Sequence, residues 1–365
     1  MTRSPRWILI AILAAVMSVT VGVAATSGKN SDGDDDSTTG TTGTTGTTGT
    51  TGTTGTTSTT DDSDDRSDDN SGKGKGGKKG GRVYTIPGAT VFPEGIAIDK
   101  RGRGTSFFVS STTDGTIFKG STKGTTMAPF APGGADGRTT ATGLEVGGGK
   151  LFVAGAATGK AFVLSTRDGS TLKVLDSKPP STDTFINDVT LAKGGAYFTD
   201  SRRPVILRAS TKDGTVGDLE PWLDLTGTPF VYQTGFNANG IVSYDDGKIL
   251  VVVQSNTGKL FRISTRSKQV SEIDLGGRTV TNGDGLVAHG SRLYVVRNAD
   301  NQIVEIKLRR DKREGRVGKT ITSNLFAFPT TAARDGSRLL VVNSQFNRRG
   351  GTPVLPFTVA SVRKP

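Results

Sequence analysis

Four oxygen-bearing side chains occupy comparable places in the sequence, each at the start of a short hydrophobic run: Glu94, Asn187, Asn239 and Asp284. Brought together, two carboxylates and two carboxamides would offer only oxygen ligands and a charge of about −2. Such a set suits a hard divalent cation, Ca²⁺ first, with Mg²⁺ or Mn²⁺ as alternatives. Asn-Gly and Asp-Gly pairs are also common in turns, so Asn239 and Asp284 alone each have a structural explanation. Glu94-Gly95 is not a favoured turn pair, so Glu94 needs another reason. The shared position of the four residues favours one common site.

The composition limits the other chemistry that this chain could perform. It contains no cysteine and a single histidine, His289. Thiolate and histidine-clustered metal sites, cysteine nucleophiles and a serine–histidine–aspartate triad are therefore excluded. His289 precedes Gly290, a position typical of a turn.

The polar residues belong to a pattern that recurs six times. Each copy has a first run that starts with a polar or small residue, a turn, and a second run rich in β-branched and aromatic residues. The first runs are 93–98, 141–146, 186–191, 238–243, 283–288 and 329–333. The second runs are 106–109, 150–153, 196–199, 248–253, 292–296 and 338–342. In four copies a tight turn leads to a third run, at 116–118, 160–163, 259–263 and 302–306.

The spacing of the copies predicts an all-β fold, a six-bladed β-propeller over residues 83–365. Corresponding residues are 48, 45, 52, 45 and 46 positions apart, the length of one four-stranded blade. We expect residues 83–86 to pair with 357–359 in the last blade, which would close the ring and hide its edges. No segment has the pattern of a long amphipathic helix.

In a propeller the first strand of every blade lines the central axis. Residues at the same repeat position must then converge on one ring. The predicted ring consists of Glu94, Thr142, Asn187, Asn239, Asp284 and Thr330.

The amino-terminal part differs in kind. Residues 1–25 have two arginines followed by an apolar run ending at Ala25, the layout of a secretory signal. The apolar stretch is also long enough to be retained as a membrane anchor. Residues 26–82 consist of threonine–glycine repeats with aspartate and lysine runs, which predicts a disordered linker. We therefore expect a secreted or cell-envelope protein, in contact with a membrane only if the signal stays uncleaved.

The formal net charge is +12, from 46 basic and 34 acidic residues. The basic residues after Arg82 lie mostly in turns, without the aromatic interleaving of nucleic-acid binders. We expect no nucleic-acid partner. The basic surface is compatible with an anionic cell-wall polymer.

Together, the segments 92–97 (FPEGIA), 187–188 (ND), 197–200 (YFTD), 239–241 (NGI) and 284–286 (DGL) resemble the senescence marker protein/gluconolactonase family, the regucalcin-like lactonases. The resemblance runs from residue 92 to about residue 345. It implies a six-bladed propeller whose central divalent cation is held by Glu94, Asn239 and Asp284. It also implies hydrolysis of a lactone or related ester.

In the mechanism that this resemblance implies, the cation polarises the carbonyl and Asp284 acts as the base that orients the attacking water. Asn187, with Asp188 and Thr142, would contact the substrate. Family members often carry an arginine two residues before the substrate-facing asparagine, where this chain has Phe185. With Phe236, Phe185 predicts a more apolar mouth than a sugar-acid lactone would need.

Two other classes of protein remain open on the sequence alone. One is a non-catalytic extracytoplasmic propeller that binds carbohydrate, peptide or wall polymer and keeps a structural ion. The other is a paraoxonase- or strictosidine-synthase-like propeller, of which the first is disfavoured because its chemistry depends on histidines. A hydrolase needs an open coordination position facing a cleft, whereas a structural ion is fully ligated.

Overall fold

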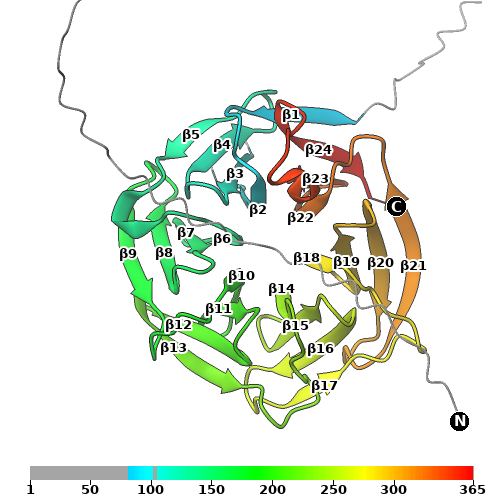
Figure 1. Ribbon diagram of the computed structural model, residues 1–365. Helices are drawn as coiled ribbons and strands as arrows, with labels where there is room; N and C mark the ends of the chain where they lie inside the picture. Colours follow the sequence, from blue (N-terminus) through cyan, green and yellow to red (C-terminus); the bar gives the residue numbers. More distant parts are fainter. Residues whose placement is uncertain (1–80, 102–104, 365) are drawn as a thin grey trace, which may run out of the picture. The chain divides into compact units, whose positions relative to one another are not determined.

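The computed structural model describes residues 81–101 and 105–364. Six four-stranded antiparallel sheets surround a central axis (Figure 1), so the predicted six-bladed β-propeller is confirmed. Helical structure within the described residues is limited to two short 3₁₀ turns, η1 (Ala135–Gly137) and η2 (Phe346–Arg348), and no helix there could span a membrane. The predicted signal segment, residues 1–25, and almost all of the predicted linker, residues 26–82, lie outside the described residues.

Each blade runs from the axis outward. The innermost strands are β2 (Pro93–Asp99), β6 (Leu144–Gly147), β10 (Ile186–Ala192), β14 (Ala238–Tyr244), β18 (Gly283–His289) and β22 (Pro329–Asp335). The second strands are β3 (Ser106–Ser111), β7 (Lys150–Ala154), β11 (Gly195–Asp200), β15 (Ile249–Gln254), β19 (Arg292–Arg297) and β23 (Arg338–Asn343). The third strands are β4 (Ile117–Ser121), β8 (Lys160–Ser165), β12 (Val205–Lys212), β16 (Lys259–Ser264), β20 (Gln302–Leu308) and β24 (Phe357–Arg363). The outer strands are β5 (Ala128–Ala131), β9 (Thr171–Asp176), β13 (Thr215–Asp224), β17 (Val270–Glu272), β21 (Gly315–Thr322) and β1 (Arg82–Ile86).

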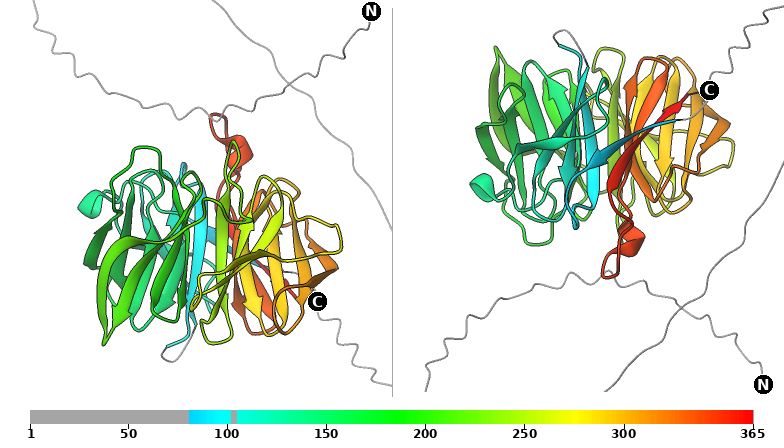
Figure 2. Two further views of the ribbon diagram at one scale, coloured as in Figure 1. Left: turned by 90° about the horizontal axis from the view of Figure 1, so that it is seen from below. Right: turned by 90° about the horizontal axis from the view of Figure 1, so that it is seen from above.

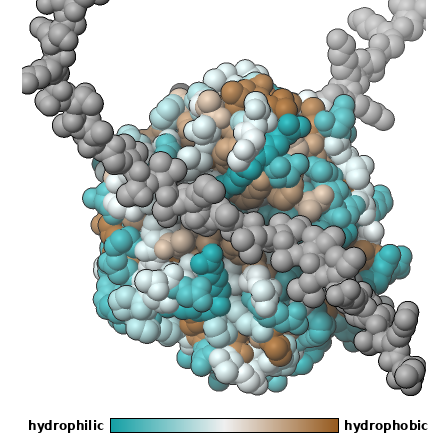
Figure 3. All heavy atoms as spheres, in the orientation of Figure 1, coloured by the Kyte–Doolittle hydropathy of each residue, from teal (hydrophilic) through white to brown (hydrophobic). Residues whose placement is uncertain are grey.

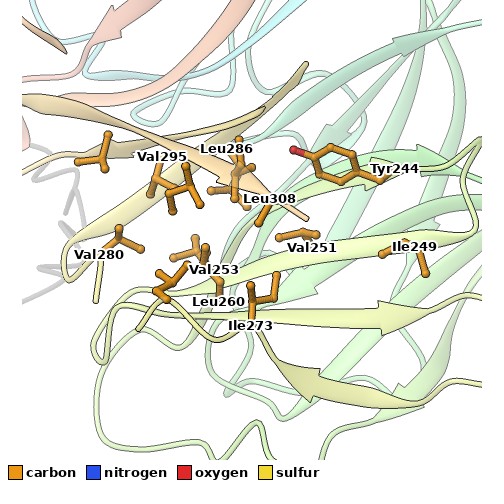
Figure 4. Close-up of a cluster of buried hydrophobic side chains, with 14 residues drawn as sticks. Tyr244, Ile249, Val251, Val253, Leu260, Ile273, Val280, Leu286, Val295 and Leu308 are labelled. Carbon is orange, nitrogen blue, oxygen red and sulfur yellow. The ribbon is translucent and has the colours of Figure 1, made fainter. Parts of the chain in front are cut away.

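The hydrophobic core is divided into six clusters, one between each pair of neighbouring blades. Strand β15 shows why the second strands are hydrophobic throughout. Ile249, Val251 and Val253 pack toward blade five, in the cluster of Figure 4. Leu250 and Val252 pack toward blade three. Both faces of the strand are buried, so alternation with polar residues is lost.

The ring closes as predicted, with one strand from each end of the described chain in blade six. Strand β1 pairs antiparallel with β24, and Ile86 lies opposite Phe357. The backbone of Thr85 also reaches blade one, because its N–H donates to the Thr125 carbonyl at 2.8 Å and its carbonyl accepts from Met127 at 2.9 Å. This strand therefore joins the last blade to the first.

A β-bulge interrupts the pairing of five innermost strands at the ring position. In β2 the register shifts between Pro93 and Ile96, and the equivalent shift recurs in β10, β14, β18 and β22. The extra residue turns the strand locally and re-aims a side chain, a common feature beside functional sites.

The glycine that follows the ring residue in four copies has a packing reason. A Cβ on Gly95 would lie 2.1 Å from the Thr142 carbonyl oxygen, and one on Gly240 would lie 2.2 Å from that of Asp284. Both glycines lie within strands. Gly95 and Gly240 are thus points of close contact between blades. Asn239-Gly240 lies within strand β14, so the turn explanation that the sequence left open for this pair is wrong.

The innermost strands all begin on one face of the propeller, which we call the ring face. The loop from Ser344 to Pro356, between β23 and β24, stands out from that face (Figure 2). Strand β24 ends on the opposite face.

Candidate functional site

The structure brings the six predicted ring residues together at the start of the innermost strands. All six are between 0 and 7% exposed. A cavity of about 300 Å³ continues from the ring along the channel, and Glu94 and Asn239 line it. The same cavity is lined by Glu145 and Asp188. The site is therefore a buried polar ring above a small axial cavity.

Two serines that directly follow the second strands β11 and β15 fix the orientation of the ring amides. Ser201 donates its hydroxyl proton to the Ala238 carbonyl at 2.6 Å, so it must accept from Asn187 Nδ2, which lies 2.8 Å away. Ser255 likewise donates to a carbonyl and accepts from Asn239 Nδ2 at 2.9 Å. Because each amide nitrogen is engaged, each Oδ1 is the group left to face a ligand.

The two ring carboxyl groups have strongly perturbed acidities. Burial raises the pKa of Glu94 well above its usual range, and the nearby charges of Asp284 and Asp188 raise it further. Glu94 Oε2 is buried and has no hydrogen-bond partner among the described residues. Burial raises the pKa of Asp284 to about 7, although a hydrogen bond of 2.8 Å from Asn298 Nδ2 opposes the shift. An unpaired carboxylate oxygen next to a second carboxyl group is an unfavourable arrangement unless a proton or a metal cation neutralises part of the charge.

Asp188 and Glu145 extend the acidic lining into the cavity. Asp188 accepts N–H bonds from Val189 at 2.8 Å and Ile241 at 3.1 Å, yet burial raises its pKa to about 7. Burial and then the charge of Asp188 raise the pKa of Glu145 to about 8. Asp188 was predicted to contact substrate, and it does line the cavity. Glu145 was not predicted, because the other copies have no acid at its repeat position.

The two ring threonines are bonded into the framework. Thr142 Oγ1 lies within donating distance of the Ala154 and Ile186 carbonyls, at 3.3 and 3.1 Å. Thr330 donates to the Glu94 carbonyl at 2.9 Å. Thr142 was predicted to contact substrate. Because its hydroxyl proton is used within the framework, its Oγ1 could only accept a hydrogen bond from a substrate.

The mouth above the ring is largely aromatic and apolar. Phe185 and Phe236 meet edge to face, with ring centroids 5.0 Å apart. Apolar surface also gathers over the β23–β24 loop on this face (Figure 3), where Val354 and Leu355 are exposed. The two phenylalanines from which an apolar mouth was predicted are thus in contact with each other. Substrate binding by Phe185 stays a prediction.

One cation near the ring was missed by sequence reasoning. Arg349, in the β23–β24 loop, has its guanidinium 4.3 Å from the Phe346 ring centroid and 5.4 Å from that of Phe92. It donates to Thr112 and its charge opposes the rise in the pKa of Glu94. The loop has no counterpart in the repeat, so no sequence signal placed this arginine at the ring.

The donor set fits a divalent cation only if carboxamides take part. Within residues 81–101 and 105–364, no three histidine, aspartate or glutamate side chains lie close enough together to hold a metal ion. Glu94 and Asp284 with the free oxygens of Asn187 and Asn239 would supply two charged and two neutral oxygens, a combination that Ca²⁺ accepts. The unpartnered Glu94 Oε2 is the observation that favours such a ligand.

The fold and the site define a six-bladed β-propeller with a buried ring of carboxyl and carboxamide groups on its axis. The sequence matches no protein-family model and no curated protein. The solved structures it resembles include the major allergen Mala s 1 of Malassezia sympodialis, at 14% identity and a TM-score of 0.55. That alignment covers 77% of this chain and 95% of the allergen.

Two enzymes are among the other similar structures. A luciferin-regenerating enzyme aligns at 13% identity with a TM-score of 0.53, over 78% of this chain and 95% of its own. The other is a catalytically inactive variant of virginiamycin B lyase from Staphylococcus aureus, in complex with quinupristin. It aligns at 13% identity with a TM-score of 0.50, over 78% of this chain and 99% of the lyase. At these identities the comparisons show a common fold.

Proposed function

We propose that this protein is a divalent-metal-dependent hydrolase of a lactone or related ester. The observation that carries the proposal is the ring itself, in which Glu94 Oε2 is buried without a hydrogen-bond partner and Asp284 is close enough to raise the pKa of Glu94. The amide nitrogens of Asn187 and Asn239 are bound by serines, which leaves both amide oxygens for a ligand. The resemblance of the ring sequences to regucalcin-like lactonases supports it. The fold neighbours named as enzymes agree with it at a coarse level.

In this proposal Glu94, Asn239 and Asp284 hold the cation, Ca²⁺ before Mg²⁺ or Mn²⁺. When bound, the cation would polarise the ester carbonyl and offset the charge that develops on its oxygen. Asp284 accepts the proton of the attacking water, and its contact with Asn298 keeps the carboxylate oriented. Asn187, held by Ser201, points its oxygen toward a substrate hydroxyl.

The mouth suggests the kind of substrate. Phe185 and Phe236 present aromatic edges and faces above the ring, and such surfaces pack against apolar groups. Arg349 adds one positive charge beside the ring. We therefore expect a small lactone or ester with an apolar body and at most one acidic group.

The test begins with metal binding by the full-length protein. Thermal melts are recorded in EDTA and across a Ca²⁺ titration for wild type, Glu94→Gln and Asp284→Asn. A cation that binds only the folded state raises the free energy of unfolding by about 2.7 kcal/mol when its free concentration is 100 times its dissociation constant. The melting temperature of wild type should rise with the Ca²⁺ concentration, and that of neither variant should change. Glu220→Gln and Asp213→Asn, at exposed positions, are the matched controls and should respond as wild type does.

The second step measures acid release from a panel of aliphatic and aromatic lactones and esters at constant pH. Metal-dependent turnover that is lost in EDTA and in Asp284→Asn supports the hydrolase. A metal response without turnover on the panel would favour the alternative, a non-catalytic propeller with a structural ion that binds carbohydrate, peptide or wall polymer. No response to Ca²⁺, Mg²⁺ or Mn²⁺ would contradict both metal proposals.

A further inference from the structure

The face opposite the ring carries a cluster of basic side chains at the other end of the channel. We call it the basic mouth: Lys100, His289, Arg292, Arg334 and Lys364. They come from the ends of strands in blades five, six and one. Lys100 and Arg334 line the axial cavity at this end. Lys364 Nζ lies 3.3 Å from His289 Nδ1.

The fold supplies little negative charge to this cluster. Arg292 is paired with Glu305, at 2.9 Å. Within the described residues, Lys100, Arg334 and Lys364 form no salt bridge. The neighbouring Arg101 shows the contrast, because Asp99 holds it at 2.6 Å.

The basic groups are close enough to repel one another. The pKa of Lys364 is lowered by burial and then by the charges of Arg334, Arg292 and Lys100. The pKa of His289 is lowered by burial and then by Lys364, Arg334 and Arg292. The repulsion destabilises the empty mouth, so an anion bound there would relieve it.

We propose that the basic mouth is a binding site for a phosphate group, separate from the ring and independent of the proposed hydrolase. Inorganic phosphate or a phosphate monoester carries close to two negative charges and three strong acceptor oxygens, and a phosphodiester polymer offers one negative charge on each of several neighbouring groups. Several of these donors can therefore bind either ligand at once. The Arg334 guanidinium can donate two parallel hydrogen bonds to a phosphate group. A single carboxylate would neutralise only one of the three cations that form no salt bridge among the described residues.

The chain contains its own reporter for this site. His289 is the only histidine in 365 residues, so an untagged, isotope-labelled full-length protein gives a single imidazole signal by NMR. Its pKa is measured in NaCl and in inorganic phosphate at equal ionic strength, with EDTA present. A bound phosphate should raise the pKa of His289 by about half a unit or more, and its signal should shift in a saturable way.

The variants separate a site from general charge attraction. Arg334→Ala with Lys364→Ala should abolish the saturable shift. Arg316→Ala with Lys319→Ala removes the same charge from the exposed outer strand β21 and should leave the shift in place. The first double variant removes like-charge repulsion, so its melting temperature should not fall below that of wild type. The proposal would be overturned if both double variants lost the saturable shift equally, or if His289 titrated identically in NaCl and in phosphate.

A second arm identifies the source of the phosphate. Purified poly(glycerol phosphate) is titrated beside inorganic phosphate at matched phosphorus concentration. Saturation at a lower concentration with the polymer supports a phosphodiester wall polymer as the ligand. Saturation with inorganic phosphate alone supports a small phosphorylated ligand, and no saturation with either excludes the site.

Discussion

At the scale of single residues, the channel is a place where acidic groups are kept in an environment that opposes their ionisation. Glu94, Glu145, Asp188 and Asp284 all have pKa values raised by burial. Only for Glu94 does the charge of a cation, Arg349, oppose this rise. These five groups therefore allow the electrostatics of the ring and of the cavity to be tested separately.

Glu145 gives a prediction about pH. Its pKa is about 8 in the folded protein and about 4.3 in an unfolded chain. Between these values the unfolded chain loses the proton and the folded protein keeps it, so the stability of wild type falls as the pH rises. Glu145→Gln removes this contribution. In urea unfolding with EDTA, the variant should gain roughly 1–3 kcal/mol relative to wild type between pH 4.5 and 8.

Above pH 9 the difference between the two proteins should be constant. Glu220→Gln, at an exposed position of β13, is the control for the loss of one carboxyl group. A Glu145→Gln difference that does not change with pH would show that this carboxyl group ionises normally in the fold.

Arg349 gives a prediction about the cation. Its positive charge lies near Glu94, so it opposes a divalent ion at the ring. Arg349→Met should bind Ca²⁺ about 3–10 times more tightly than wild type, by calorimetry. Arg348→Met, at the exposed neighbouring position, should match wild type. Weaker binding in Arg349→Met would mean that the arginine supports the site.

The repeat made the ring residues predictable, because equal positions in six copies must meet on the axis. The orientation of their side chains was not predictable in this way. It depends on Ser201 and Ser255, which directly follow β11 and β15 and whose role appears only once the strands are paired. Arg349 was missed because its loop is outside the repeat, and Glu145 because it occurs in one copy alone.

At the scale of elements, the innermost strands are shaped by contact between blades. In five of the six blades a bulge lies at the ring position, where one residue reaches the axis, and the next residue must be small where the neighbouring backbone approaches. The first and second strands could be located from their hydrophobic runs. Outer strands such as β9 and β21 could not, because almost all of their residues are exposed or half-buried and they contain no continuous hydrophobic run.

Gly240 tests this interpretation. In Gly240→Ala the new methyl group would lie 2.2 Å from the Asp284 carbonyl oxygen, so β14 and β18 must move apart. We expect a loss of about 1–3 kcal/mol in the free energy of unfolding. In Gly124→Ala the nearest atom is 3.7 Å away, and the change should stay within about 0.5 kcal/mol. Similar effects of the two substitutions would contradict the close-contact explanation.

At the scale of the whole molecule, β1 determines whether the six blades behave as one unit. It pairs with β24 in blade six and bonds through Thr85 to blade one. A ring closed in this way has no blade whose loss leaves its neighbours unaffected, because every core cluster is shared between two blades. We therefore expect wild type to unfold in a single transition.

Thr85→Pro should break the closure. Proline removes the N–H that donates to Thr125 and cannot replace it. The variant should melt at a lower temperature and over a broader range, measured by calorimetry. Thr85→Val keeps the backbone donor and the β-branched shape, so it should melt close to wild type. A sharp, unshifted transition in Thr85→Pro would show that the ring does not depend on this strand.

The same closure has a consequence for synthesis. Strand β1 is made at the start of the propeller and its partner β24 at the end, more than 270 residues later. A nascent chain can stack its first blades as they emerge, but it cannot close the ring until Phe357 and the residues after it have left the ribosome. A chain that stalls or is cleaved before that point presents open strand edges on both β1 and β23, and such edges recruit other strands.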